Sequence, residues 1–424
     1  MLSPPDSGHV HGQQYLLEGL AQKYQIDCYG VIKHQKTIEK TGATFYRYPE
    51  SVEEHLWLAS PYNLLSNTPQ EKRLFLIQNW EAQKEKFSFV LINWLLNMAK
   101  EYQAVITDHA FYQRSGFAIP YVSQILGLPL IGTYTGSFEE YSFNSHFLPE
   151  KVNFTLSDPM LFHLGYQNIL NFFNTIVDSM IHYLHNNNIE VYFSSREYLN
   201  YVFSGYPVFL GNRFSTMQLG GLDQKHQFLH GDLIYFSLDT VCNHDLTLFE
   251  TIISTLNMLP YKSIISSGGN YYVYDILHEQ YRKYGNIEIY PFVNQLEVLS
   301  EAKIFITHAG AGSVYEGIYL GTPLICIPQN FDQPYNAKKI VELGLGVSLN
   351  QTEKNIAAQL TLSIKNLEDN WMFYMTNIEN MRQTFLESNS PEQAVQNIEA
   401  LLFKDTNLLT GCSSDTCQSQ QENV

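Results

Sequence analysis

Residues 306–317 read ITHAGAGSVYEG, an apolar strand that runs into a turn of small residues and then into a helix. This order puts a helix N-terminus, with unpaired backbone N–H groups, at the C-terminal end of a strand. Such a place binds phosphate, because the donors and the helix dipole point the same way. Gly310 and Gly312 let the backbone approach a ligand closely, while Ser313 and His308 add side-chain donors. The segment therefore predicts a phosphate site; the alternative is a tight strand-to-helix turn without a ligand.

Strands and helices alternate on both sides of this turn. In the second half of the chain, strands are predicted at 233–238, 262–266, 288–293, 303–307 and 323–328, and helices at 245–259, 297–302, 312–321 and 336–343. Strands that alternate with helices at this spacing favour an α/β fold with a parallel, doubly wound sheet.

The first half shows the same alternation. Strands are predicted at 25–33, 41–49, 104–107 and 128–133, and a long helix is predicted from Thr68, a candidate N-cap followed by Pro69 and Glu71. Two such halves predict two Rossmann-like domains. Turn residues without periodicity place their connection near 205–225. The predicted division is 1–210 for the first domain, 211–405 for the second, and 406–424 for a disordered polar tail.

Composition excludes several classes of protein. The chain has 25 basic and 42 acidic residues, a net charge of −17, which disfavours a nucleic-acid partner. We expect no transmembrane segment, since even the most apolar helical stretch, residues 160–184, is too polar to cross a bilayer. A secretory signal is not recognisable, and five scattered cysteines indicate a reducing compartment, so we expect a cytoplasmic protein.

The residues after the turn extend the pattern. Residues 321–328 read GTPLICIP and lead to Asp332, Gln333 and Asn336, and upstream residues 292–299 read FVNQLEVL. The stretch 308–336 resembles the donor-binding signature of the family-1 type UDP-glycosyltransferases, which include macrolide, plant and animal enzymes. The resemblance implies the GT-B fold, in which two facing Rossmann-like domains with parallel sheets hold the active site between them.

Carried over residue by residue, the resemblance implies a donor site in the second domain. Phe292 would stack on the base and the backbone of Val293 would read its edge, while Gln295 and Glu316 would hold the ribose. By the same resemblance, His308 and the turn residues Gly310, Ala311, Gly312 and Ser313 would hold the diphosphate. Asp332 and Gln333 would form hydrogen bonds with the hydroxyls of the sugar.

A second pattern lies at the other end of the chain. Gly8-His9-Val10 precedes a helical run and resembles the family's opening turn, in which the histidine is the general base. Histidine suits this task because its pKa lies near neutral pH. Asp108 ends the predicted strand 104–107, where the family places the acid that orients this histidine. His9 could instead be a mobile terminal residue.

Two departures from the family pattern stand out. Relatives have a complete apolar strand before the Gly-His turn, whereas here only residues 1–7 (MLSPPDS) precede it, and Pro4-Pro5 cannot form a central strand. The first strand of the N-terminal sheet is therefore expected to be missing. The other departure is Asp239, which stands where relatives have glycine beside the donor diphosphate.

The resemblance implies an inverting, metal-independent transfer of a sugar from a nucleotide-sugar, by default a UDP-sugar, with no cofactor. We expect a monomer. The acceptor is expected to be a small hydrophobic molecule, since the first half is rich in aromatic residues at Tyr112, Phe117, Tyr134, Phe138, Tyr141 and Phe143. Two alternatives stay open: a GT-B nucleotide-sugar epimerase, and a non-catalytic or impaired nucleotide-sugar-binding protein, which the missing strand and Asp239 would favour.

Overall fold

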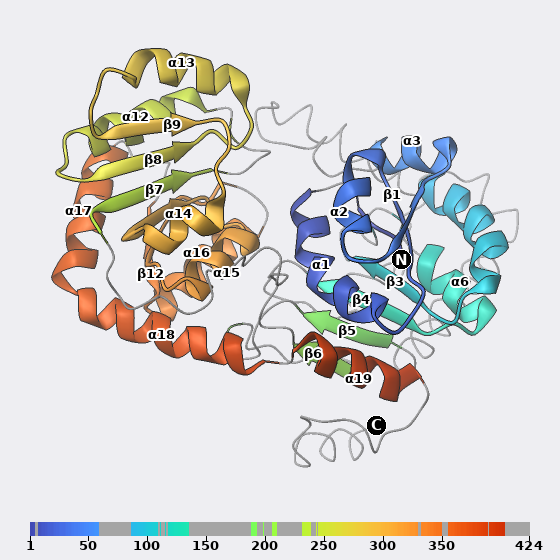
Figure 1. Cartoon of the computed structure of the whole chain (residues 1–424). Coiled ribbons are helices and arrows are strands. Elements are labelled where there is room, and N and C mark those ends of the chain that lie inside the picture. Colours follow the sequence, from blue (N-terminus) through green and yellow to red (C-terminus); the bar gives the residue numbers. More distant parts are fainter. Residues whose placement is uncertain are drawn as a thin grey trace, which may run out of the picture.

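The computed structural model describes residues 1–58, 86–134, 188–192, 198, 206–209 and 231–402, apart from short gaps at 5–6, 109–110, 112–114, 116–117, 239–242, 244, 330–331, 350–354 and 389. Two α/β units face each other, with the first half of the chain on one side and the second half on the other (Figure 1).

The second unit is built on a six-stranded sheet. All its neighbouring strands are parallel, in the order β12-β11-β10-β7-β8-β9. The strands are β7 Leu233–Ser237, β8 Lys262–Ser266, β9 Ile287–Tyr290, β10 Ile304–Thr307, β11 Leu324–Cys326 and β12 Gly346–Ser348. The order steps outward from β7 in both directions. The sheet is therefore doubly wound, as the alternating pattern predicts.

Helices connect these strands and cover the sheet. They are α12 Leu246–Asn257, α13 Tyr271–Tyr281, α14 Gln295–Glu301, α15 Ala311–Tyr319, α16 Gln333–Glu342 and α17 Ile356–Asp369. Asp245 caps α12 by accepting from the backbone N–H of Leu248. The sequence predictions for β8 and α12 are confirmed nearly to the residue, whereas α13 had no predicted counterpart.

The first unit contains a smaller parallel sheet. Strands β3 Val105–Asp108, β4 Leu130–Tyr134, β5 Asn188–Tyr192 and β6 Tyr206–Phe209 follow one another in order, and β1 Asp27–Gly30 pairs with β2 Thr44–Arg47. Strand β6 lies at the start of the segment 205–225 predicted to connect the two domains, and inside the predicted first domain, 1–210.

Residues 1–3 fill the gap between β1 and β3. Leu2 forms parallel bridges to both Tyr29 and Thr107, and the backbone N–H of Leu2 donates to Ile106 O at 2.8 Å. At the position of the predicted missing strand, Leu2 forms single bridges instead of a full ladder. One buried leucine joins the two parts of the sheet, so the edges of β1 and β3 find partners without an ordinary strand.

The helices of the first unit are α1 Ser7–Ala21, α2 Gln35–Glu39, α3 Glu50–Leu58, a helix at 86–98 and α6 Ala118–Leu126, with short 3₁₀ turns at Ile32–His34 and Ala99–Glu101. The predicted start of the long helix at Thr68 and the polar tail lie outside the described residues.

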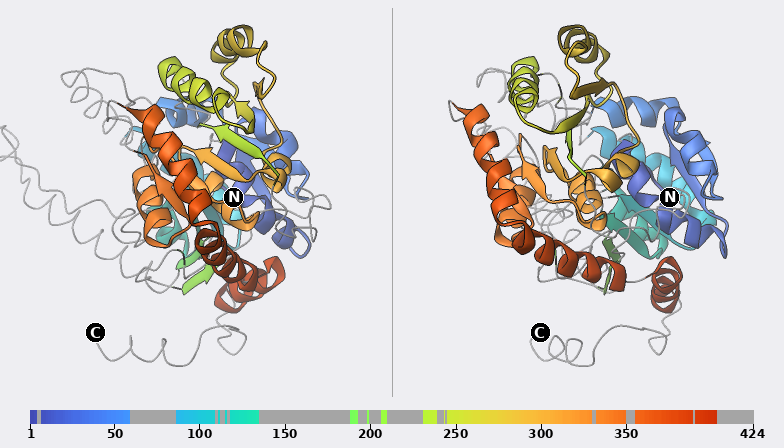
Figure 2. Two further views of the ribbon diagram at one scale, coloured as in Figure 1. Left: turned by 90° about the vertical axis from the view of Figure 1, so that its left-hand side faces the viewer. Right: turned by 60° about the vertical axis from the view of Figure 1, so that its left-hand side comes forward.

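The last two helices join the units. Helix α18 Trp371–Glu387 packs on α15 of the second unit, and α19 Pro391–Leu402 packs on α1 of the first. Figures 1 and 2 show α18 running away from the larger sheet to bring α19 beside α1. The predicted division by chain order assigns α19 to the second domain, whereas in space this helix lies with the first.

Candidate functional site

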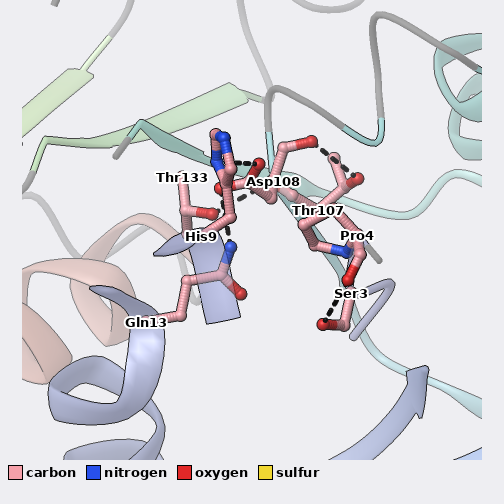
Figure 3. Close-up of polar contacts among 7 residues, drawn as sticks. All are labelled: Ser3, Pro4, His9, Gln13, Thr107, Asp108 and Thr133. Atoms are coloured by element: carbon pink, nitrogen blue, oxygen red, sulfur yellow. Dashed lines mark hydrogen bonds and ion pairs between the residues drawn. The ribbon is translucent and has the colours of Figure 1, made fainter. Parts of the chain in front are cut away.

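His9 lies in the first turn of α1 and faces the C-terminal end of β3. Its Nδ1 is 3.0 Å from Oδ1 of Asp108, and the Asp108 side chain is fully buried while that of His9 is 22% exposed. Figure 3 shows the imidazole directed at the carboxylate. The two residues that the sequence assigned as base and orienting acid are thus brought together. A buried carboxylate at Nδ1 favours the tautomer that leaves Nε2 as the proton acceptor.

A third residue contacts the same carboxylate. Nε2 of Gln13 donates to the second oxygen of Asp108, Oδ2, at 2.6 Å (Figure 3). Sequence reasoning missed Gln13. The signal was available in its position, since it lies four residues after His9 and therefore on the same face of α1.

Helix α1 packs against α19. Leu16 and Leu20 pack in one cluster with Ala394, Val395 and Ile398 of α19. At the end of α1, Tyr24 donates to Glu399 at 2.7 Å and Lys23 pairs with the same carboxylate at 3.1 Å. The hydrogen bond from Tyr24 lowers the pKa of Glu399 and helps to keep it ionised. The position of His9 therefore depends on α19.

The turn between β10 and α15 forms the second part of the site. Ala309 has a positive φ of 65°, a conformation that is uncommon for a residue other than glycine. It is held by Asn336, whose Nδ2 donates to Ala309 O at 2.9 Å. Backbone held in such a conformation is concentrated at functional sites. The turn directs the N-terminus of α15, which begins after Gly310, away from the sheet.

His308 lies over Gly310. A Cβ added at Gly310 would come within 2.3 Å of Nε2 of His308, so the absence of a side chain lets the imidazole occupy its place. His308 is 9% exposed. Gly312 and Ser313, which follow in the first turn of α15, are half-buried.

We expect Gly310→Ala to weaken nucleotide-sugar binding without unfolding the protein. The backbone at Gly310 has φ −63° and ψ 143°, which alanine adopts freely, so the new methyl would act by displacing His308. Losing one hydrogen bond to a charged phosphate corresponds to an increase in Kd of about tenfold to a hundredfold, measurable by calorimetry. Gly285→Ala is the control, because nothing lies within 4 Å of a Cβ there. An unchanged Kd would show that His308 takes no part in donor binding.

Asp332 connects the turn to α16. Its Oδ2 accepts from the backbone N–H of Ala311 at 3.3 Å and from Nδ2 of Asn336 at 3.0 Å. Burial raises the pKa of Asp332 to about 6, against the opposing effect of these hydrogen bonds and of the charge on His9. These two hydrogen bonds fix the carboxylate of Asp332 beside the first residue of α15.

Gln333 contacts a different segment from Asp332, the residue with which it was predicted to bind the sugar. It is 2% exposed, and its Oε1 accepts from the backbone N–H of Gln329 at 2.8 Å. This contact positions the loop between β11 and α16. The predicted role of Gln333 toward a sugar hydroxyl therefore requires its amide nitrogen or a movement of the side chain.

Gln295 and Glu316 contact each other, as expected of two residues that share one part of a ligand. Gln295 Nε2 donates to Glu316 and to Ser313 Oγ, the latter at 3.3 Å, and Gln295 Oε1 accepts from the Tyr235 hydroxyl at 2.9 Å. Tyr235 is a further member of the cluster that the sequence did not identify. These contacts orient polar side chains beside the N-terminus of α15.

Phe292 is 59% exposed, an unusual state for a large aromatic side chain. Its ring covers Gly269, where an added Cβ would come within 2.4 Å of the ring. Val293 is half-buried beside it. An aromatic ring supported by backbone on one side and open on the other can stack on a flat ligand.

Several predicted features lie outside the described residues. They are Asp239 and five of the six aromatic residues considered for the acceptor; the sixth, Tyr134, is fully buried at the end of β4. Within the described part of the chain, no three His, Cys, Asp or Glu side chains are grouped as metal ligands. No helix in that part is both long and apolar enough to cross a membrane.

Comparison with known proteins agrees with this geometry. The model of the glycosyltransferase family 28 C-terminal domain matches residues 246–397. An uncharacterized UDP-glucosyltransferase, YdhE, of Bacillus subtilis is 32% identical over 40% of this chain and 42% of its own length. The NDP-glycosyltransferase YjiC of Bacillus licheniformis is 36% identical over 28% of this chain and 29% of its own length. The chain thus spans less than half the length of these curated relatives.

Solved structures extend the likeness to the whole fold. The glycotransferase of kitacinnamycin has a TM-score of 0.70 at 18% identity, covering 95% of this chain and 98% of that one. At this identity the likeness concerns the fold, which is GT-B as the sequence predicts.

Proposed function

We propose that this chain is a family-1 type glycosyltransferase that transfers a sugar from a nucleotide-sugar, by default a UDP-sugar, to a hydroxyl of a small hydrophobic acceptor. The proposed transfer proceeds with inversion and without a metal ion or cofactor. The observation that carries the proposal is the pair formed by Nδ1 of His9 and Oδ1 of the buried Asp108, at 3.0 Å. An imidazole oriented by a buried carboxylate is the arrangement that a general base needs.

The proposed reaction is a single displacement. Nε2 of His9 takes the proton of the acceptor hydroxyl while the acceptor oxygen attacks the anomeric carbon of the sugar. The bond from that carbon to the diphosphate oxygen breaks, and the nucleoside diphosphate leaves with the electron pair. Asp108 stabilises the imidazolium that forms.

The leaving group gains negative charge as the bond breaks. We propose that the backbone N–H groups of Gly312 and Ser313 in the first turn of α15, together with the Ser313 hydroxyl and His308, stabilise the diphosphate. Phe292 would stack on the base and Gln295 with Glu316 would hold the ribose. Asp332, whose pKa of about 6 leaves it mostly ionised at neutral pH, would accept hydrogen bonds from sugar hydroxyls.

The test is donor binding and donor turnover measured together. Purified protein is titrated with a panel of UDP-sugars by calorimetry, and release of UDP is followed with and without hydrophobic acceptors. We expect one donor to bind and UDP to be released. His9→Ala should reduce the rate by about 10²- to 10⁴-fold, since it removes the base.

The matched control is His11→Ala, which removes an exposed histidine from the same helix and should leave the rate unchanged. Binding without UDP release would point instead to a nucleotide-sugar-binding protein. Interconversion of the donor without loss of UDP would point to an epimerase. Absence of binding to every donor would contradict the donor site itself.

A further inference from the structure

The buried carboxylate of Asp108 is held at both oxygens by one helix. Oδ1 faces Nδ1 of His9, Oδ2 accepts from Nε2 of Gln13, and both contacts come from the same face of α1. Gln13 is 1% exposed and Asp108 is 0% exposed. Figure 3 shows His9 and Gln13 approaching the carboxylate from α1, one turn apart.

A carboxylate in this environment needs both contacts. Water cannot replace a lost hydrogen bond at a fully buried oxygen, so loss of the bond from Gln13 would carry a cost of desolvation. Loss of that bond also removes a restraint on the terminal torsion of the carboxylate, which is soft. Rotation would move Oδ1 away from the imidazole. The bond at Oδ2 therefore fixes the plane in which Oδ1 meets His9.

We propose that Gln13 is a positioning residue for the reaction: it fixes Asp108 so that the imidazole of His9 is kept with its proton on Nδ1 and with Nε2 free to accept a proton. The inference rests on the proposed function for its kinetic part. Its structural part, the tautomer of His9, does not depend on which reaction is catalysed. Gln13 contacts no reacting atom and acts only through Asp108.

The first variant is Gln13→Met, which keeps the length and volume of the side chain but removes the donor. A base misplaced by about 1 Å can lower a rate on the order of 10²-fold, so we expect kcat to fall by about tenfold to a hundredfold while the donor Kd stays unchanged. Gln14→Met is the matched control. Gln14 is the next residue of α1, also buried, and its Nε2 points to Thr37 O at 3.5 Å, outside the site.

The second variant is Gln13→Glu, which makes the effect depend on pH. While the introduced carboxyl is protonated, its O–H can donate to Oδ2 as the amide does. Once ionised, it is a second negative charge beside Oδ2 of Asp108, whose other oxygen faces His9. Two adjacent carboxylates raise the pKa of one of them. We therefore expect kcat relative to wild type to be highest at low pH and to fall as pH rises.

The third measurement does not use activity. In protein labelled with ¹⁵N-histidine, the imidazole signals of His9 are identified by their loss in His9→Ala, and they report which nitrogen carries the proton. We expect one tautomer with Nδ1–H in wild type and in Gln14→Met, and a mixture in Gln13→Met. This measurement needs no turnover of a donor, so it tests the tautomer of His9 independently of the proposed reaction.

Two outcomes would overturn the inference. One is an unchanged His9 tautomer in Gln13→Met. The other is a Gln13→Glu rate that stays a constant fraction of wild type at every pH, because a purely structural defect would not follow the charge of the introduced group. Rescue of Gln13→Glu at low pH, together with tautomer mixing in Gln13→Met, would establish the role.

Discussion

Asp108→Asn should lower kcat by about 10³- to 10⁴-fold while the protein folds and binds its donor as before. The amide is nearly isosteric with the carboxylate, so the buried site keeps its volume. It cannot stabilise a positive imidazolium, and its NH₂ group, facing Nδ1, would favour the tautomer in which Nε2 carries the proton and cannot accept one. The measurement is kcat at saturating donor, with the donor Kd taken from calorimetry.

The matched control is Asp275→Asn, an acid-to-amide change at an exposed position of α13. It should leave both quantities unchanged. A rate of Asp108→Asn within about threefold of wild type would mean that His9 works without its buried partner. The base would then have to be sought elsewhere, even if donor binding is intact.

Tyr198→Ala should cost about 3–5 kcal/mol in the free energy of unfolding, the range found for truncation of large buried aromatic side chains. Tyr198 belongs to the chain between β5 and β6 of the first unit, but its ring is fully buried among helices of the second. It packs edge-on to Tyr315 at 5.5 Å and lies 6.1 Å from Phe385.

The backbone of Tyr198 is held as well. Its carbonyl accepts from Nζ of Lys339 on α16, and that ammonium also lies 5.4 Å from the centre of the Tyr198 ring. Lys339 is 9% exposed, and this burial lowers the pKa of its ammonium to about 8. Losing the ring should therefore loosen the two units from each other.

Urea denaturation followed by circular dichroism measures the effect. Tyr198→Phe is the control, because it keeps the ring and should cost less than about 1.5 kcal/mol. A loss below 1 kcal/mol in Tyr198→Ala would show that the ring contributes little to holding the units together.

Much of the second unit could be predicted from the sequence, for physical reasons. Buried parallel strands such as β8 and β10 are short apolar runs bounded by turn residues, so their pattern is local. The pairing of His9 with Asp108 was predicted from the resemblance to the family's opening turn and to the strand end at which that family places its acid. The roles proposed for the donor-site residues stay predictions until a ligand is measured.

The features that the sequence did not reveal depend on distant contacts. Helix α13 reads YYVYDILHEQY, and its many tyrosines obscure the helical period. Leu2 acts as a strand only because Tyr29 and Thr107 lie on either side of it. Gln13 is an ordinary polar helix residue until the carboxylate of a strand 95 positions away comes against it.

The packing of α19 on α1 has a consequence for synthesis on the ribosome. Lys23 and its partner Glu399 are 376 positions apart, so the apolar face of α1 is covered by residues that are made much later. At about 5–20 residues per second, that face stays uncovered for roughly 20–75 s after it emerges. Throughout this interval Leu16 and Leu20 lack the neighbours that α19 will supply, and the nascent chain offers an apolar helix to chaperones.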